Sequence, residues 1–590
     1  MPTPYSLDRA RLAAAYSSGA LTPSVLVRDV FRAIAQTRAD SNPIWIHLPP
    51  EDAVAAQARQ LEARRAAGEE LPLYGIPFAV KDNIDVASLP TTAACPAYAY
   101  IPRHTAHAVR MLEQAGALLI GKTNLDQFAT GLVGTRSPYG ACFNPFDRRY
   151  IAGGSSSGSA LAVATGLASF AFGTDTAGSG RIPAAFTNIV GLKPTRGLIS
   201  TSGIVPACRS LDCVSVFALS CADALAVLAT AGDYDPADPY SRRPEEPEGF
   251  SAERFRFVLP HRGQLEFFGD RAYATLFEAA VARLQALGGT PAEADFTPFL
   301  AAQQLLYDGP WIAERAAELG GFIASHPEAV HPVTRAVIES GRGYSAIDAF
   351  KAQYRLAGLK RATEAVWQAG DVLVVPGAPT IYTIAQVEAD PITLNSRLGL
   401  YTNFVNLLDL AAITVPAGFR PDGLPFGVTL IGPAFSDRPL AALGARLHAA
   451  SCETAGACGA RVPQAAPAQA VSSTVQLAVV GAHLSGMPLN HQLTERGARL
   501  LRTTRTAPLY RLYALTDNTP PKPGLVHVER AGHGTSIEVE LWEMPLRLFG
   551  PFVAAIPSPL GIGTIELESG EPVKGFLCEP YAVEGLPDIT

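Results

Sequence analysis

The sequence is poor in the residues that build disulfide scaffolds and metal clusters. Its 590 residues include only eight cysteines, which are scattered along the chain without a C-x-x-C pair. Secreted disulfide frameworks and structural zinc sites need cysteines at short, repeated spacings. We therefore expect reduced thiols in a hydrophobic core, no bound metal and no other cofactor.

Long apolar runs and clusters of positive charge are also missing. No stretch approaches the roughly 20 apolar residues of a membrane-spanning helix, and polar residues interrupt the first segment, MPTPYSLDRARLAAAYSSG, too early for a signal peptide. The net charge is −7 without any lysine or arginine run, which argues against a nucleic-acid ligand. These absences predict a cytoplasmic protein that binds neither membrane nor nucleic acid.

The residues that are present have the composition of a compact globular enzyme, with 48% hydrophobic and 17% charged residues. Helical patterns alternate with short buried strands, one of which, in GIPFAVKD, ends at Lys81. After about residue 450 the pattern changes, because Ala457–Ser473 is rich in Ala, Pro and Gln and alternating β-type runs follow it. We predict an α/β domain over 1–456 with a helix-covered sheet, a linker over 457–473 and a small, mostly β domain over 474–590.

Two short patterns match motifs of other enzyme classes. GALLIGKT, from Gly116 to Thr123, fits the phosphate-binding pattern G-x-x-x-x-G-K-[ST], but its central residues are apolar and strand-like, whereas a phosphate loop needs available backbone N–H groups. GSSSG, from Gly154 to Gly158, fits the nucleophile-elbow pattern with Ser156 as nucleophile. The sequence does not supply the matching His and Asp, so this second interpretation stays open as a rival.

A third arrangement explains more residues. Ser155 and Ser179 stand in two glycine-dense turns, separated by a small-residue helix and the strand SFAFGTD. This segment can return the chain so that both hydroxyls meet at one end of the sheet. If the strand-end Lys81 reaches the same place and burial lowers its pKa, the neutral amine can deprotonate Ser155, which in turn relays the proton of Ser179.

The glycines around Ser179 have a chemical use in this arrangement. Backbone N–H groups can approach an oxyanion closely only where side chains are small or absent. The segment DTAGSG supplies such groups at Thr176, Ala177, Gly178 and Ser179. We predict that this turn forms an oxyanion hole.

Four segments together match a known family pattern: GIPFAVKDNIDV, LLIGKTNLDQFA, GGSSSGSALAVA and GTDTAGSGRIPAAFTNIVGLKPT. Through them the chain resembles the amidase signature family over about residues 20–450. The resemblance implies that family's fold, a mixed sheet covered by helices, and amide hydrolysis by a Ser-cisSer-Lys triad. It implies Ser179 as nucleophile, Ser155 as the cis-peptide serine and Lys81 as base, with Asp175 and Arg181 supporting the loop. The GALLIGKT strand becomes part of the family pattern.

Further segments narrow the resemblance to one subgroup. DTAGSGR, VPACRSLDCVSVFA and LGLYTNFVNLLDLAAITVPAG are similar to the allophanate hydrolases of the family. VVGAHLSGMPLNHQL and LYRLYALTDNTPPKPGLVHV resemble the domain that those enzymes append, which is similar in fold to γ-glutamylcyclotransferase-like β barrels. The resemblance implies hydrolysis of allophanate to ammonia and N-carboxycarbamate, which then yields carbon dioxide and further ammonia.

Allophanate is urea carrying a carboxylate, so its site needs a fixed cation. The subgroup resemblance implies Tyr307 and Arg315 as substrate contacts, and the planar guanidinium of an arginine suits a carboxylate. If LLYDGPWIAERAAELG is helical throughout, these two residues lie about 80° apart around one helix. In the appended domain the resemblance points to His483, which we predict to donate a proton to the second step.

The sequence leaves the partners and two rival functions open. The subgroup suggests a homodimer, and a urea carboxylase or another urea-pathway enzyme as partner. One rival function is that of a generic amidase or a Ser-His-Asp hydrolase. The other is a scaffold that binds or assembles without catalysis. Assays of ammonia release from allophanate and from neutral amides distinguish these functions.

Overall fold

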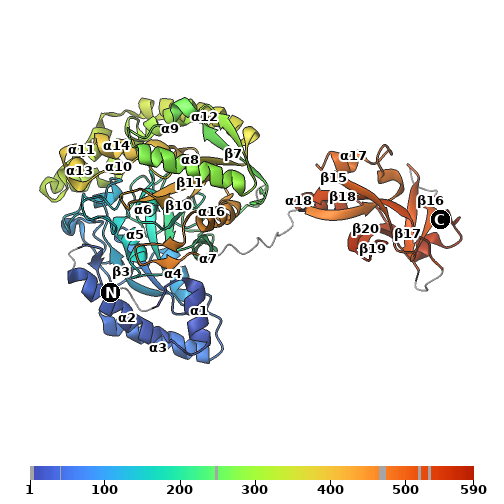
Figure 1. The fold of residues 1–590 in the computed structure, drawn as a ribbon, viewed down its shortest axis with the longest axis horizontal. Helices are drawn as coiled ribbons and strands as arrows, with labels where there is room; N and C mark the ends of the chain where they lie inside the picture. The colour runs from blue at the N-terminus through green and yellow to red at the C-terminus, as the bar shows by residue number, and fades with distance from the viewer. Residues whose placement is uncertain (1–4, 40–41, 246–249, 464–473, 516–519, 529–532) are drawn as a thin grey trace. The chain divides into compact units, whose positions relative to one another are not determined.

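The computed structural model describes residues 5–39, 42–245, 250–463, 474–515, 520–528 and 533–590. Contacts within the chain divide it into two units, Met1–Ala466 and Pro467–Thr590 (Figure 1). Of the expected linker 457–473, residues 464–473 lie outside the described residues. The part before them contains a short strand, β13 (Ala460–Arg461), which pairs with β12 (Thr454–Ala455).

One mixed sheet of eleven strands organises the described part of the first unit. Its strands are β1 (Trp45–His47), β2 (Pro77–Lys81), β3 (Leu118–Thr123), β4 (Phe170–Asp175), β5 (Val190–Lys193), β6 (Cys213–Ala218), β7 (Phe255–Pro260), β8 (Gly289–Ala294), β9 (Val372–Pro376), β10 (Leu410–Phe419) and β11 (Pro425–Pro433). Their order across the sheet is β1-β3-β2-β4-β6-β5-β10-β11-β9-β7-β8. The strand β2 runs parallel to both β3 and β4, and β7 runs parallel to β8 and β9, whereas the other neighbours are antiparallel.

Helices cover this sheet, and for that reason its central strands are buried along their whole length and consist mostly of apolar residues. The helices are α1 (Arg9–Ser17), α2 (Pro23–Ala39), α3 (Glu51–Ala66), α4 (His107–Gln114), α5 (Ser157–Ala164), α6 (Ile182–Phe186), α7 (Cys221–Ala231), α8 (Arg271–Ala286), α9 (Thr297–Tyr307), α10 (Trp311–Ser325), α11 (Pro332–Ser340), α12 (Ala346–Ala369), α13 (Ile384–Ala389), α14 (Thr393–Leu398), α15 (Phe404–Leu407) and α16 (Asp437–Ser451). The predicted α/β fold, a mixed sheet covered by helices, is confirmed. Among the described residues, no helix has the length and apolar character needed to cross a membrane.

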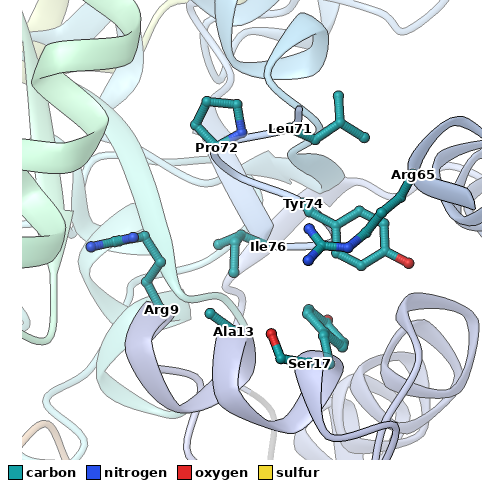
Figure 2. A pocket seen from close by; sticks show the side chains of 9 residues that line it. Arg9, Ala13, Ser17, Arg65, Leu71, Pro72, Tyr74 and Ile76 are labelled. Carbon is teal, nitrogen blue, oxygen red and sulfur yellow. The ribbon is translucent and has the colours of Figure 1, made fainter. Parts of the chain in front are cut away.

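The helices α1 and α3 pack around the segment that leads into β2 (Figure 2). The guanidinium of Arg65 lies over the ring of Tyr74, 4.6 Å from its centroid. The Tyr16 hydroxyl donates to the carbonyl of Gly75 at 2.9 Å. Gly75 has a φ of +67°, and a side chain there would meet the ring of Pro23 at 2.6 Å. These contacts fix the start of the strand whose other end carries Lys81.

The second unit is rich in β structure. Its described residues form a five-stranded sheet in the order β15-β18-β14-β20-β19 and a separate pair, β16-β17. The elements are β14 (Thr474–Val479), α17 (His491–Thr494), β15 (Arg499–Arg505), β16 (Tyr510–Leu515), β17 (Lys522–His527), β18 (Glu538–Pro545), α18 (Leu546–Ala554), β19 (Leu560–Glu566) and β20 (Pro572–Cys578). The predicted β-rich character is confirmed, whereas the likeness to γ-glutamylcyclotransferase-like barrels stays a prediction.

Candidate active site

The topology brings Lys81, Ser155 and Ser179 together. Parallel neighbours β2 and β4 end at the same edge of the sheet, so Lys81 at the end of β2 meets the turn after β4 that carries Ser179. Ser155 lies just before α5, which packs on both strands. The Ser155 Oγ is 2.7 Å from the Nζ of Lys81 and 3.0 Å from the Oγ of Ser179. The peptide bond between Gly154 and Ser155 is cis. The three side chains form a buried hydrogen-bonded chain along which a proton can move.

The Lys81 ammonium has no access to water. Burial lowers the pKa of Lys81 from 10.5 to about 7, against the opposing effect of the Asp126, Asp212 and Asp175 charges, and the positive charge of Arg315 lowers it further. A lysine with such a pKa is partly neutral at neutral pH and can accept a proton. Its Nζ also donates to the Oγ1 of Thr174 at 2.7 Å, which fixes the amine beside Ser155.

A buried ion pair holds the turn after β4. Arg181 donates to both carboxylate oxygens of Asp175, at 2.9 Å through Nε and 2.8 Å through Nη2. The same carboxylate accepts the backbone N–H groups of Gly178 and Gly180, each at 3.0 Å. Although burial alone would raise the pKa of Asp175, its pKa is lowered because Arg181, the charge of Lys193 and the N–H of Gly180 favour the charged form. The two residues that we expected to support the loop are therefore in contact with it.

The turn presents three backbone N–H groups for an oxyanion. Among the described residues no protein acceptor bonds the N–H of Thr176, Ala177 or Ser179. Gly178 differs from our expectation, because its N–H donates to Asp175 inside the turn and is not free for a ligand. The glycine itself is still required, since its φ is +127° and L side chains rarely adopt that conformation.

Two further residues hold this turn, and neither was among the predicted site residues. The Thr176 hydroxyl donates to the Oδ1 of Asp212, and the Oδ2 of the same carboxylate accepts the N–H of Ala207 at 2.8 Å. The Thr402 hydroxyl donates to the carbonyl of Ala177 at 2.6 Å. Both Asp212 and Thr402 lie inside segments that resemble the subgroup. The sequence signal was therefore present, but their contacts depend on the fold.

The two rival motifs do not form their sites. Lys122 of GALLIGKT is buried in β3, with Nζ 3.1 Å from the Oδ1 of Asp82 and hydrogen bonds to Pro90 and Thr91. This lysine is therefore not in a phosphate loop. The Ser156 hydroxyl donates to the carbonyl of Thr174 at 3.1 Å, and within the described ranges it has no histidine partner.

The segment that carries Tyr307 and Arg315 is not helical throughout. Helix α9 ends at Tyr307 and α10 begins at Trp311, because Gly309 and Pro310 interrupt the helical pattern. The two residues still meet: Arg315 Nη2 lies 3.5 Å from the Tyr307 hydroxyl, and the guanidinium carbon lies 5.6 Å from the ring centroid.

The Arg315 guanidinium is buried without a counter-ion. The residue is only 2% exposed. Its Nη1 donates to the Oγ1 of Thr130 at 2.8 Å, and among the described residues no carboxylate oxygen lies within 4.0 Å of the guanidinium. Because Arg315 affects the pKa of Lys81, the two charges interact. The charge of Asp212 acts on Arg315 only from a greater distance. A buried cation without a direct ion pair is unfavourable, which suits a site that receives an anionic ligand.

His483 lies in the second unit, directly after β14. Its Nε2 is 3.0 Å from the Oε1 of Gln492, and its ring stacks on Phe576 with centroids 4.9 Å apart. Burial lowers the pKa of His483 below its usual 6.5, so the ring is neutral at neutral pH. Because the Gln492 Oε1 can only accept, the single N–H of the neutral ring is at Nε2 and is donated to Gln492, which leaves Nδ1 as an acceptor.

Comparisons with known proteins agree with the two units. Residues 26–440 match the family model Amidase, and residues 475–590 match the allophanate hydrolase C-terminal domain. The chain is 44% identical over 571 residues to urea amidolyase from Saccharomyces cerevisiae, a match that covers 94% of this chain but 31% of that protein.

Two solved structures resemble the chain over different lengths. Kluyveromyces lactis allophanate hydrolase superposes with a TM-score of 0.77 at 41% identity, covering 100% of this chain and 97% of the other. The peptide amidase of Stenotrophomonas maltophilia superposes with a TM-score of 0.64 at 27% identity, covering 78% of this chain and 99% of the other. The chain therefore belongs to the amidase family and carries, after its amidase region, an allophanate hydrolase C-terminal domain.

Proposed function

We propose that the protein hydrolyses allophanate to ammonia and N-carboxycarbamate. The observation that carries the proposal is the buried Arg315, which has no ion pair within 4.0 Å among the described residues and whose charge acts on Lys81 of the hydrogen-bonded Lys81–Ser155–Ser179 triad. The Lys81–Ser155–Ser179 triad provides the amide hydrolysis. The guanidinium provides a partner for the carboxylate that distinguishes allophanate from a neutral amide. The 41% identity to K. lactis allophanate hydrolase supports the same substrate.

The proposed roles follow from the geometry. Neutral Lys81 takes the proton of Ser155 while Ser155 takes that of Ser179, and the Ser179 Oγ attacks the carbon of the terminal amide. The N–H groups of Thr176 and Ala177 stabilise the tetrahedral oxyanion. Its collapse breaks the C–N bond, and the leaving nitrogen regains a proton through Ser155 and departs as ammonia.

The second half of the reaction repeats this proton path with water. Lys81 and Ser155 deprotonate a water molecule that attacks the acyl group on Ser179. The acyl–oxygen bond then breaks, Ser179 is restored, and N-carboxycarbamate leaves. The guanidinium of Arg315, with the Tyr307 hydroxyl beside it, holds the substrate carboxylate throughout.

A substrate comparison tests the proposal. Biuret replaces the carboxylate of allophanate by a carboxamide and leaves the scissile amide unchanged. We expect kcat/KM for allophanate to exceed that for biuret by at least about 100-fold, because biuret leaves the buried guanidinium unpaired. Similar values for allophanate, biuret and acetamide would indicate a generic amidase, and no ammonia from any of them would indicate a scaffold.

The pH dependence of the reaction reports on the base. Because only neutral Lys81 accepts a proton and its pKa is about 7, kcat/KM for ammonia release should fall by about tenfold per pH unit below that value. Lys81→Arg keeps the charge but cannot become neutral, so this variant should be inactive at every pH. A wild-type profile that stays flat well below pH 7, measured on allophanate with a coupled ammonia assay, would contradict a role for Lys81 as base.

We also propose that the second unit, from about residue 474, is a separate domain that processes N-carboxycarbamate with His483. In the step that we assign to it, one carboxylate leaves as carbon dioxide and the nitrogen of the remaining carbamate takes a proton. Because the N–H of the neutral ring is donated to Gln492, the other ring nitrogen, Nδ1, takes a proton from solvent, and the imidazolium so formed donates it to the carbamate nitrogen, which restores the neutral ring.

His483→Asn should leave the first ammonia nearly unchanged and slow carbon dioxide formation severalfold. The first product can be followed by ¹³C NMR with labelled allophanate. His533→Asn is the matched control, because His533 is an exposed histidine of the same unit and is not among the groups that shift the pKa of His483. Equal product rates for both variants would mean that the domain assembles the protein rather than catalysing.

The chemistry of the substrate also suggests partners. Carboxylation of urea forms urea-1-carboxylate, which is allophanate, so a urea carboxylase or another urea-pathway enzyme is the proposed supplier. We further propose a cytoplasmic homodimer. The chain spans about a third of the yeast urea amidolyase, 31% of its length. Sedimentation of the purified protein, alone and with a urea carboxylase, tests both associations.

A further inference from the structure

Thr130 lies between two buried arginines. Its hydroxyl accepts a hydrogen bond from Arg315 Nη1 at 2.8 Å, and its carbonyl accepts one from Arg136 Nη1 at 3.0 Å. The exposed fractions of Arg315 and Arg136 are 2% and 3%. In the described part of the chain no carboxylate oxygen lies within 4.0 Å of either guanidinium. Thr130 is thus the residue through which the two cations are connected.

The direction of the Thr130 hydroxyl is fixed. A threonine hydroxyl has one hydrogen and two lone pairs, and here its hydrogen is donated to the carbonyl of Phe128 at 3.1 Å. The oxygen therefore offers only lone pairs to Arg315. The same Nη1 also donates to the carbonyl of Ala129 at 3.5 Å, so this nitrogen is held by the segment 129–130, and Nη2 and Nε remain to meet a ligand or the Tyr307 hydroxyl.

The backbone on either side of Thr130 is held as well. Phe128 and Ala129 both have positive φ angles, of 51° and 53°, a backbone conformation that residues other than glycine rarely adopt. The N–H of Phe128 donates to the carbonyl of Ala93 at 2.9 Å. Arg136, besides holding the Thr130 carbonyl, donates to the carbonyl of Pro391 at 2.5 Å. The Thr130 oxygen is therefore a fixed acceptor.

We propose that Thr130 is a positioning residue that determines specificity for the carboxylate, an inference that rests on the proposed hydrolysis of allophanate. Its hydroxyl orients the Arg315 guanidinium, and Arg136 holds Thr130 in place through its main chain. Recognition of a carboxylate by two parallel N–H groups depends on the orientation of the guanidinium plane. A guanidinium without this anchor would turn toward other acceptors, and the carboxylate would lose one of its two hydrogen bonds.

The test compares two substitutions of nearly equal size. Thr130→Val removes the oxygen and keeps the branched shape, whereas Thr130→Ser keeps the oxygen. For Thr130→Val we expect kcat/KM on allophanate to fall by about 10- to 100-fold, mainly through KM. On biuret, which has no carboxylate, the fall should be below about threefold. Thr130→Ser should remain within about threefold of the wild type on both substrates. Melting temperatures of all three proteins show whether the fold is intact.

A second variant disturbs Thr130 through its main-chain carbonyl, which Arg136 binds. Arg136→Lys keeps a positive charge but has a single nitrogen, which cannot donate to Thr130 and Pro391 in the same fork geometry. Like Thr130→Val, this variant should lower the ratio of kcat/KM on allophanate to kcat/KM on biuret, but by a smaller factor. This variant takes over the test if Thr130→Val does not fold.

The outcomes separate the inference from the proposed function. If the wild type prefers allophanate and Thr130→Val loses activity equally on both substrates, or loses none, Thr130 has no role in specificity and the inference is wrong. If the wild type itself does not prefer allophanate over biuret, the proposed function fails before any variant is compared.

Discussion

Replacing Ser179 by alanine is expected to lower the turnover of allophanate by about four to six orders of magnitude, as for other catalytic units that act together. The reason is that only the Ser179 Oγ lies both at the end of the proton path and beside the free N–H groups of the turn. Ser155→Ala and Lys81→Ala break the same path and should lose a comparable factor. Combining two of the substitutions should add little further loss, because the residues act as a unit. Single-turnover ammonia release measures each variant.

The neighbouring serine provides the matched control. Ser156 is as buried as Ser155, but its hydroxyl donates to the carbonyl of Thr174 and takes no part in the proton path. Ser156→Ala should therefore keep most of the wild-type activity. If Ser179→Ala stays active while Ser156→Ala is inactive, the nucleophile-elbow interpretation replaces the one proposed here.

The elements that carry these residues were predictable because they depend on local sequence. The apolar run before Lys81, the small-residue helix after Ser155 and the strand before Asp175 each have the period and the glycine boundaries of the element found there. Sequence does not give the order of strands across a sheet. The side-by-side placement of β2 and β4, on which the meeting of Lys81 with Ser179 depends, therefore needed the structure.

Contacts between distant segments could not be predicted. Asp212 and Thr402 lie in segments that resemble the subgroup, but these segments do not indicate that the two side chains reach the turn after β4. The engagement of the Gly178 N–H by Asp175 depends on the bend of the turn. The lowered pKa of His483 likewise comes from its packing in the folded domain.

The break between Tyr307 and Arg315 is a different case, because its signal was in the sequence. Pro310 lacks a backbone N–H, and Gly309 before it favours non-helical backbone. A count of positions around one ideal helix ignores both residues. The angle of about 80° around one ideal helix therefore does not describe this segment. The two side chains still meet, as that angle predicted, but they do so from two separate helices.

Replacing Arg315 by methionine is expected to reduce kcat/KM on allophanate by about 30- to 1000-fold, which corresponds to roughly 2–4 kcal/mol of transition-state binding. Methionine fills much of the same volume without charge, so the carboxylate of the substrate would be buried unpaired. Arg315→Lys should lose less, because it retains the charge but not the paired N–H groups that a carboxylate prefers. The kcat/KM on biuret should fall far less with either substitution. The ratio of kcat/KM on allophanate to kcat/KM on biuret measures the effect.

The same substitution should also move the pH profile, and the direction follows from the charges. The positive charge of Arg315 lowers the pKa of Lys81. Without it the pKa of Lys81 rises, so the neutral amine appears only at higher pH and the acid limb of kcat/KM shifts to higher pH in Arg315→Met but not in Arg315→Lys. Substrates must therefore be compared above this limb, where Lys81 is neutral in every variant. If kcat/KM above the acid limb falls equally for allophanate and biuret, Arg315 stabilises the fold instead of binding the carboxylate.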